Sequence, residues 1–322
     1  MDLAFSDEQV ALRDTVRGLL ARECPPDAVR DAWTNETGRT TTAWARLHEI
    51  GALSILAPEP HGLGLGLVDL VLVLEEAGRA ALPEPIVEHA AVAAPVVNPG
   101  GGTATAAVPG APTVLDADTA DILLLWDDDE LHGVARADVA LAAIPAIDAS
   151  RRMFTVEWTP STTTRLDADA SAAYDRGALG TAAVLLGLAH HLLDTTVEYA
   201  SHRTQFGAPI GSFQAVKHYL ADVAIALEFA RPLTYRAAWS LDTADPGASA
   251  HVSMAKAQAG DAAELAARHA LQCHGAIGYS DESDLHLWMK RVWALSAAWG
   301  DAAWHRDRVR RAMLDGDEGA RR

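Results

Sequence analysis

The chain has 322 residues, of which 49% are hydrophobic, and 44 acidic against 26 basic residues give it a net charge of −18. This acidic balance disfavours nucleic acid and anionic membrane surfaces as partners. No apolar run of about 20 residues lacks polar interruption, so we expect no membrane span. The acidic start of the sequence does not resemble a signal peptide, and the two Cys residues suggest no disulfide framework. We therefore expect a cytoplasmic protein.

Residues 1–98 are expected to form a helical N-terminal domain. Ser6 and Gln9 have the spacing of a capping box in front of an apolar-periodic segment. A strongly apolar, buried helix is expected at 67–80. The Gly-rich loop before it does not follow a strand, so it is not interpreted as a dinucleotide-binding fingerprint.

The helical period ends at the Gly-rich stretch 98–102, and residues 99–165 are expected to form a small, reduced β domain. Short apolar runs separated by Pro, Gly and Asp are typical of strands and turns. The predicted strands lie at 104–108, 122–126, 139–144 and 154–158.

Residues 166–322 return to the helical period and are expected to form a C-terminal antiparallel four-helix bundle. The predicted helices span 174–202, 212–241, 248–274 and 285–313, and Pro232 should kink or split the second of them. The predicted fold class is therefore mostly α, with a small β domain between two helical domains.

The first candidate site lies where the first bundle helix ends. Arg203 carries a planar fork of donors suited to a diphosphate, and Gln205, Phe206 and Gly207 follow it. Ser212 is expected to cap the next helix. An ordinary helix–turn–helix hairpin with a surface Arg is an equally weighted alternative.

The second candidate site ends the third bundle helix with the sequence Gln272-Cys273-His274-Gly275-Ala276-Ile277-Gly278-Tyr279. Its glycines permit a tight turn and close approach of a ligand to the backbone. A glycine helix stop with a buried His is the simpler alternative. Cys273 and His274 are not expected to act as a nucleophile pair, because adjacent helical residues point in different directions. No metal-ligand spacing occurs, so no metal site is predicted.

Together, this order of domains and these two motifs resemble the acyl-CoA dehydrogenase family. The resemblance implies an FAD cofactor, an acyl-CoA substrate and an electron-transfer flavoprotein as electron acceptor. It also implies that each bundle lends groups to the FAD of a neighbouring subunit. The residues implied to contact FAD are Arg203, Gln205, Phe206, Gln214, Gln272, His274, Gly275 and Ala276, with Arg203 on the diphosphate.

The sequence departs from the family at the catalytic base. The family usually uses a Glu in the last bundle helix, whose pKa is raised by a dry pocket. That position falls on Trp299 here, and Trp accepts no proton. Asp175 and Asp301 are the remaining candidate bases. The family's two flavin-holding strands are also not evident in residues 99–165.

These departures favour one interpretation over two alternatives. The chain resembles the shorter subunit type of actinobacterial heteromeric α2β2 acyl-CoA dehydrogenases, in which a paralogous partner subunit would supply the catalytic Glu. A homo-oligomeric enzyme with a relocated Asp base is the second hypothesis. A non-catalytic helical scaffold or binding protein is the third.

Overall fold

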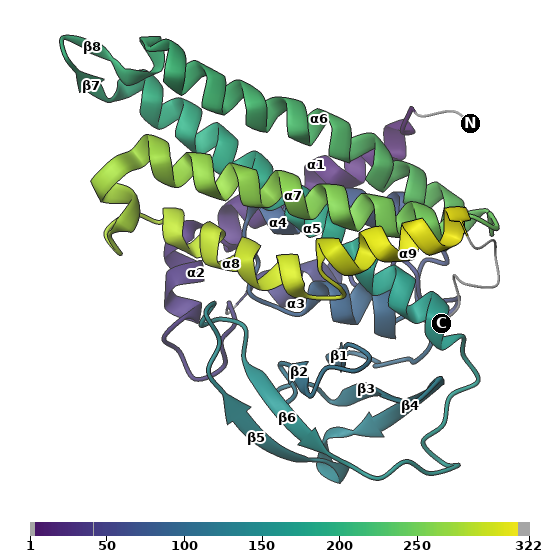
Figure 1. Ribbon diagram of the computed structural model, residues 1–322. Coiled ribbons are helices and arrows are strands. Elements are labelled where there is room, and N and C mark those ends of the chain that lie inside the picture. Colours follow the sequence, from purple (N-terminus) through teal and green to yellow (C-terminus); the bar gives the residue numbers. More distant parts are fainter. Residues whose placement is uncertain (1–3, 41, 315–322) are drawn as a thin grey trace.

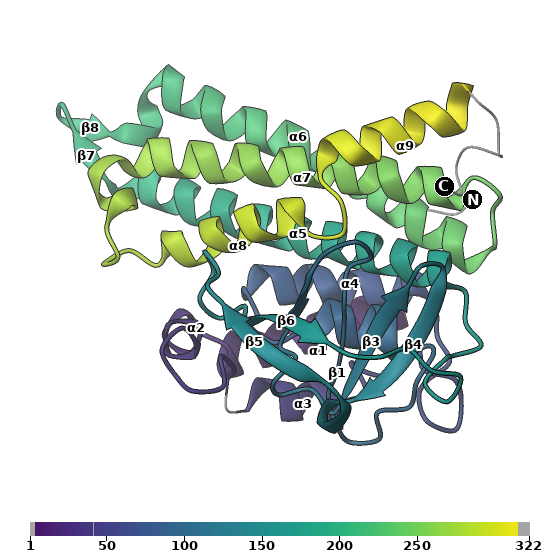
Figure 2. The same ribbon diagram turned by 60° about the horizontal axis from the view of Figure 1, so that its bottom comes forward.

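The computed structural model describes residues 4–40 and 42–314 of the chain. Helices come first, two small sheets follow, and a bundle of long helices completes the chain (Figure 1). This order confirms the predicted fold class. The sheets lie against one side of the helices, beneath α8 in the turned view (Figure 2).

The N-terminal region consists of short helices that lead to one strongly apolar helix. Ser6 and Gln9 form the predicted capping box at the start of the first helix. The apolar helix ends one residue before its predicted end, and a π-helical turn, Val87–Ala93, comes after it. The helices are α1 (Asp7–Glu23), α2 (Pro26–Ala32), α3 (Ala43–Glu49) and α4 (Leu67–Arg79).

The middle region contains two three-stranded sheets, with strand orders β1-β3-β4 and β2-β6-β5. The pair β1–β3 is parallel, and the other pairs within these sheets are antiparallel. The four predicted strands are present. Strand β2 was not predicted because a Pro directly precedes it, and β4 was not predicted because charged residues and a Gly interrupt its apolar pattern. The strands are β1 (Ala104–Ala106), β2 (Thr113–Leu115), β3 (Ile122–Asp127), β4 (Glu130–Ala135), β5 (Ala140–Ile144) and β6 (Met153–Glu157).

The bundle differs from the prediction in its last helix, which is broken in two. The break lies at Trp299 and Gly300, which both adopt positive φ angles, of 55° and 89°. Pro232 does not split its helix. Ser212 does not cap that helix, because Phe213 is its N-cap residue and the Ser212 hydroxyl donates to the carbonyl of Pro209. The helices are α5 (Ala170–His202), α6 (Gln214–Asp242), α7 (Ala248–His274), α8 (Leu285–Ala297) and α9 (Ala302–Leu314).

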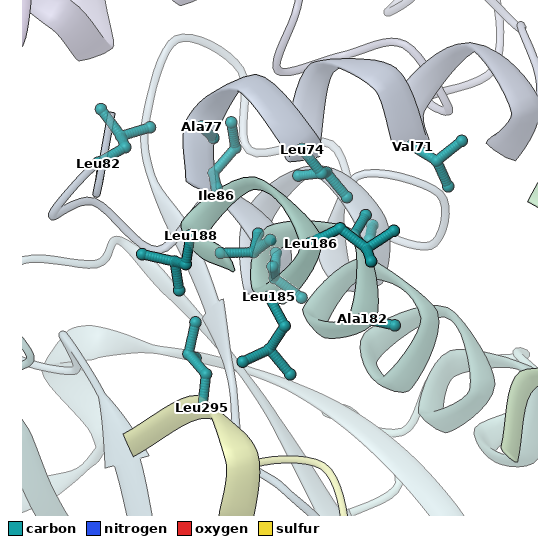
Figure 3. Packing of buried hydrophobic residues seen from close by; sticks show 14 of the residues in the cluster. Val71, Leu74, Ala77, Leu82, Ile86, Ala182, Leu185, Leu186, Leu188 and Leu295 are labelled. Carbon is teal, nitrogen blue, oxygen red and sulfur yellow. The ribbon is translucent and has the colours of Figure 1, made fainter. Parts of the chain in front are cut away.

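Two glycines allow α4 and α5 to touch along their backbones. A Cβ atom at Gly187 would lie 1.8 Å from the carbonyl oxygen of Glu75, and one at Gly78 would lie 2.1 Å from that of Val184. This close approach brings the apolar side chains of both helices into one buried cluster (Figure 3). By length and composition α5 could cross a membrane, but 78% of its most apolar window is buried, as expected of a central core helix.

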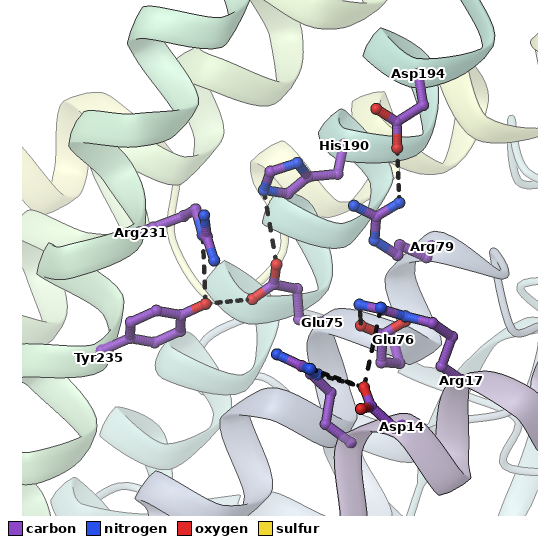
Figure 4. Close-up of polar contacts among 10 residues, drawn as sticks. Asp14, Arg17, Glu75, Glu76, Arg79, His190, Asp194, Arg231 and Tyr235 are labelled. Atoms are coloured by element: carbon purple, nitrogen blue, oxygen red, sulfur yellow. Dashed lines mark hydrogen bonds and ion pairs between the residues drawn. The ribbon is translucent and has the colours of Figure 1, made fainter. Parts of the chain in front are cut away.

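A polar network crosses the same core between α4, α5 and α6 (Figure 4). The hydroxyl of Tyr235 donates to Oε2 of Glu75 over 2.7 Å, and Nε of Arg231 contacts the same hydroxyl at 3.4 Å. Burial raises the pKa of Glu75. His190 lies 3.6 Å from Glu75, but burial lowers its pKa to about 4, so at neutral pH this contact is not an ion pair.

Replacing Tyr235 by Phe should therefore destabilise the fold, because it leaves a buried carboxyl without its donor. We expect a loss of about 1–3 kcal/mol in the free energy of unfolding, measured by urea denaturation. Tyr279→Phe is the matched control, because that side chain is 80% exposed, and should change stability by less than about 0.5 kcal/mol. Equal stability of the two variants would contradict the role assigned to the network.

Candidate functional site

The first predicted site is a hairpin that projects from one end of the bundle (Figure 1). Strand β7 (Thr204–Gln205) pairs with β8 (Ala208–Pro209). The two residues between them, Phe206 and Gly207, adopt positive φ angles of 52° and 79°. Arg203 ends α5, and its backbone N–H donates to the carbonyl of Tyr199 over 2.8 Å.

The hairpin presents its side chains to the outside of this chain. Phe206 is 95% exposed, and Gln205 and Arg203 are exposed as well. Among the residues that the structure describes, none pairs with the guanidinium of Arg203. The ring of Phe206 contacts that of Phe213 edge to face, with centroids 6.2 Å apart. An unpaired cation beside an exposed aromatic ring is a surface suited to an anionic ligand or another subunit.

The second predicted site lies beside the first. The ring of His274 is buried and stacks on Tyr199 with centroids 4.2 Å apart, and its Nδ1 lies 2.8 Å from the carbonyl oxygen of Ala270. Burial lowers the pKa of His274. The next residue, Gly275, ends α7 with a φ of 61°, and nothing lies within 4 Å of where its Cβ would be. His274 therefore orients the turn, and Gly275 leaves its backbone open to a ligand.

A groove of about 580 Å³ joins the two motifs, since Arg203 and His274 both line it. Tyr199, one helical turn before Arg203, also lines it, and the sequence analysis missed this residue. The other predicted cofactor residues in these elements are exposed around the same end of the bundle and do not line the groove: Gln205, Phe206, Gln214, Gln272, Gly275 and Ala276.

The position predicted for the catalytic base is occupied by Trp299, which has no solvent exposure. Trp299 is fully buried, and its indole Nε1 donates to Oε1 of Glu88 over 3.3 Å. Its carbonyl oxygen accepts hydrogen bonds from the hydroxyl of Tyr174, at 2.9 Å, and from Nε2 of His305, at 2.8 Å. A Cβ at Gly177 would lie 2.6 Å from the indole ring, so the ring rests directly on α5. This arrangement holds a large side chain that cannot accept a proton.

The two candidate Asp bases have other partners. Asp175 is buried, with Oδ1 accepting from Nη1 of Arg308 over 2.6 Å and Oδ2 accepting from the hydroxyl of Ser249 over 2.5 Å. Asp301 is exposed and accepts the backbone N–H of Trp304 over 2.8 Å at the start of α9. The first is the anion of a buried ion pair, and the second is a helix cap.

A cavity of about 340 Å³ lies between the β sheets, the end of α8 and Trp299. Its lining is mostly apolar, and the polar side chains in it belong to Glu88, Thr113 and Arg151. None of these three residues was singled out from the sequence, because none stands in a recognisable motif. In the described part of the chain, no group of three or more His, Cys, Asp or Glu side chains could hold a metal ion.

Lys256 fixes the segment that carries Trp299. Its ammonium is buried, and Nζ donates to the carbonyls of Leu295, Ser296 and Gly300 at 3.3, 3.1 and 3.0 Å. A cation at this place stabilises the carboxyl end of α8. Burial nevertheless lowers the pKa of Lys256 to about 7.

Comparison with known proteins agrees with this architecture. The family profile "Acyl-CoA dehydrogenase, N-terminal domain" matches residues 6–103, and "Acyl-CoA dehydrogenase, C-terminal domain" matches residues 168–314. The acyl-CoA dehydrogenase IpdE2 of Mycolicibacterium smegmatis is 33% identical over 301 residues, which covers 89% of this chain and 93% of that protein. IpdE2 of Mycobacterium tuberculosis is also 33% identical, over 300 residues, covering 89% of this chain and 91% of that protein.

A solved structure shows the same fold. One chain of the ChsE4–ChsE5 complex from Mycobacterium tuberculosis superposes with a TM-score of 0.88 at 24% identity, covering 98% of this chain and 99% of that one. Together, the two family profiles and the relatives at 33% identity make the chain a flavoprotein oxidoreductase. The chain belongs to the acyl-CoA dehydrogenase family, which confirms the resemblance found in the sequence, and its cofactor is FAD.

The residues at the hairpin end fit the diphosphate of FAD. Arg203 offers an unpaired planar fork, and Gly275 offers backbone that no side chain covers. When bound, FAD supplies the acceptor for the hydride of the family's reaction, and the residues of this chain would supply position and charge. At the Trp299 end, the chain places an indole where the family's base is expected.

The depressed pKa of Lys256 predicts how the stability of the fold changes with pH. Below pH 7 the folded and unfolded states both hold the proton, and the cost of burying the ammonium is present in full. Between about 7 and 10.5 the unfolded state holds the extra proton, so the free energy of unfolding should rise with pH. Lys256→Met should flatten this rise, whereas exposed Lys217→Met should keep it.

The measurement is urea unfolding of the three proteins across about pH 6 to 9.5. A profile of Lys256→Met that parallels that of the parent chain would show that Lys256 does not titrate in this range.

Proposed function

We propose that this chain is the cofactor-completing subunit of a heteromeric FAD-dependent acyl-CoA dehydrogenase. The reaction is the α,β-desaturation of an acyl-CoA thioester, and a paralogous partner subunit supplies the catalytic Glu. The observation that carries the proposal is the asymmetry of the site. Arg203 is exposed and no described residue pairs with its guanidinium, whereas the base position holds the buried Trp299.

The contacts of the two Asp residues support this division of labour. A base must be free to take the substrate's α-proton, but both oxygens of Asp175 already accept hydrogen bonds, from Arg308 and Ser249. Asp301 faces solvent, and its carboxylate caps α9 by accepting the backbone N–H of Trp304. The homo-oligomeric alternative would require one of these residues to leave its partners.

The relatives agree with a heteromeric assembly. One solved structure that superposes well is a complex of two differently named chains, ChsE4 and ChsE5. We infer that this chain likewise pairs with an acyl-CoA dehydrogenase subunit and that an electron-transfer flavoprotein accepts the electrons. We further propose a cytoplasmic location.

The direct test is to purify this chain alone and together with its co-expressed partner subunit, and to compare bound flavin by absorbance. We expect near-stoichiometric FAD in the complex and little in the lone chain. FAD retained by the lone chain would favour the homo-oligomeric enzyme. A folded complex without flavin would favour the non-catalytic scaffold.

Arg203→Ala should weaken FAD retention in the purified complex by roughly 10-fold to 100-fold, since a charge-assisted hydrogen bond contributes about 1.5–3 kcal/mol. Arg46→Ala is the matched control, because this exposed Arg pairs only with Glu49 on α3. Flavin titration measures both. Full retention of FAD by Arg203→Ala would exclude the role assigned to this residue.

Asp301→Asn should leave the acyl-CoA oxidation rate of the complex within about twofold, because Asn keeps the helix-capping oxygen and removes only the acid–base function. The rate is followed with an artificial electron acceptor. A loss of two or more orders of magnitude in kcat would instead identify Asp301 as the base.

A further inference from the structure

The bend between α8 and α9 is bound by a single buried ammonium group. Nζ of Lys256, on α7, donates to three backbone carbonyls, those of Leu295 and Ser296 at the end of α8 and that of Gly300 just before α9. Helix α7 runs alongside both of the helices that meet at the bend (Figure 2). An ammonium has three N–H bonds, so this contact uses every donor that Lys256 has.

The number of donors at this place depends on the proton of Lys256. A neutral amine keeps only two N–H bonds and carries a lone pair instead of the third, so it leaves one of the three carbonyls without a donor. Loss of the proton also removes the attraction between a cation and the negative end of the α8 dipole. The bend is therefore bound more weakly by the amine than by the ammonium.

The surroundings of Lys256 allow this proton to leave near neutral pH. Burial lowers the pKa of Lys256 to about 7, although the carboxylates of Asp301 in the bend and Glu264 on α7 act in the opposite direction. From α5 and α9, Asp175 and Arg308 form an ion pair of their own at 2.6 Å. Among the described residues of α6 and α8, none contributes a charge that acts on this ammonium.

The other contacts of the bend do not change in this pH range. The carbonyl oxygen of Trp299 accepts hydrogen bonds from Tyr174 and His305. Burial raises the pKa of Tyr174 and lowers that of His305 to about 3, so both side chains stay neutral around pH 7. The seat of Trp299 therefore persists, and the contacts of Lys256 are the ones that respond to pH.

Lysine is rare in this chain and suits such a role. It occurs at three positions, 217, 256 and 290, among 26 basic residues. An Arg at position 256 would keep its charge throughout the physiological range, whereas a buried Lys changes its protonation state readily. With only three Lys residues, the side chain of each one can be observed separately.

We propose that the bend between α8 and α9 is a pH-sensitive switch operated by Lys256. With the ammonium, the carbonyls at the bend are bound and residues 296–301 are closed; with the amine, one carbonyl is released and this segment opens locally. The whole fold nevertheless gains stability when the proton leaves, because the cost of a buried charge disappears. Local protection of the bend and global stability thus change in opposite directions. The switch needs neither FAD nor a partner subunit.

The first measurement is the titration of Lys256 itself. The full chain is labelled with ¹³C-lysine, and its three side-chain signals are followed by NMR from about pH 6 to 9.5. The Lys256 signal is the one that both Lys217→Met and Lys290→Met retain. We expect it to titrate with a midpoint near 7.

The second measurement is backbone hydrogen exchange of residues 296–301. Lys256→Met and the parent chain are compared at the same pH, so that the intrinsic exchange rates cancel. At about pH 6 the variant should exchange roughly tenfold faster, because Met donates nothing to the carbonyls. This ratio should fall at least about threefold by pH 9.5, since the parent chain has then lost a donor and the charge. Exposed Lys217→Met is the matched control and should exchange like the parent chain.

The parent chain alone decides the matter if Lys256→Met does not fold. Exchange at residues 296–301, expressed relative to that of a core segment of α5 at the same pH, should become faster across the Lys256 titration. Any one of three results would overturn the proposal: a Lys256 signal that does not titrate in this range, equal exchange of Lys256→Met and the parent chain at low pH, or protection of the bend that rises together with global stability.

Discussion

The burial of Trp299 between α5 and the β region is the constraint on which the rest of the site depends. Its backbone adopts the left-handed region, which costs a non-glycine residue roughly 1–2 kcal/mol. The buried indole more than offsets this, since loss of a buried aromatic side chain typically costs about 3–5 kcal/mol. The bend between α8 and α9 is therefore stable, and Tyr174, His305 and Glu88 hydrogen-bond to Trp299 there.

The charges near this bend follow from the same constraint. The bend leaves backbone carbonyls at the end of α8 without helical partners. The ammonium of Lys256, on α7, donates hydrogen bonds to the carbonyls of Ser296 and Gly300. Helix α9, which follows the bend, runs in a new direction. This direction brings Arg308 of α9 into an ion pair with Asp175 of α5. These buried charges stabilise one geometry of the bend, because removing either partner would leave the other charge without compensation.

Much of the fold was predictable because its signals are local. The apolar period of α5, α6 and α7 and the capping box at Ser6 are read directly from neighbouring residues. The break at Trp299 was missed because the apolar period continues across it, and only the packed indole and the left-handed Gly300 end the helix. The end of the helix at this point is therefore set by tertiary packing and not by the helix propensity of the residues.

The residues of the candidate site also fall into two groups, those that a local motif predicts and those that only the folded structure brings together. Arg203 and His274 were identified because each stands in a compact motif, and the structure brings both to one groove. The ion pair of Asp175 joins residues 133 positions apart, and no local pattern predicts it. Arg151, which lines the cavity beside Trp299, had no motif either.

The two ends of the bundle therefore carry opposite kinds of polar group. At the hairpin end, the polar groups are solvated, so leaving them unpaired costs little until a ligand or subunit arrives. At the Trp299 end, the polar groups are desolvated, and each must have a partner or destabilise the fold. Asp175, Lys256 and His305 satisfy this requirement within the chain.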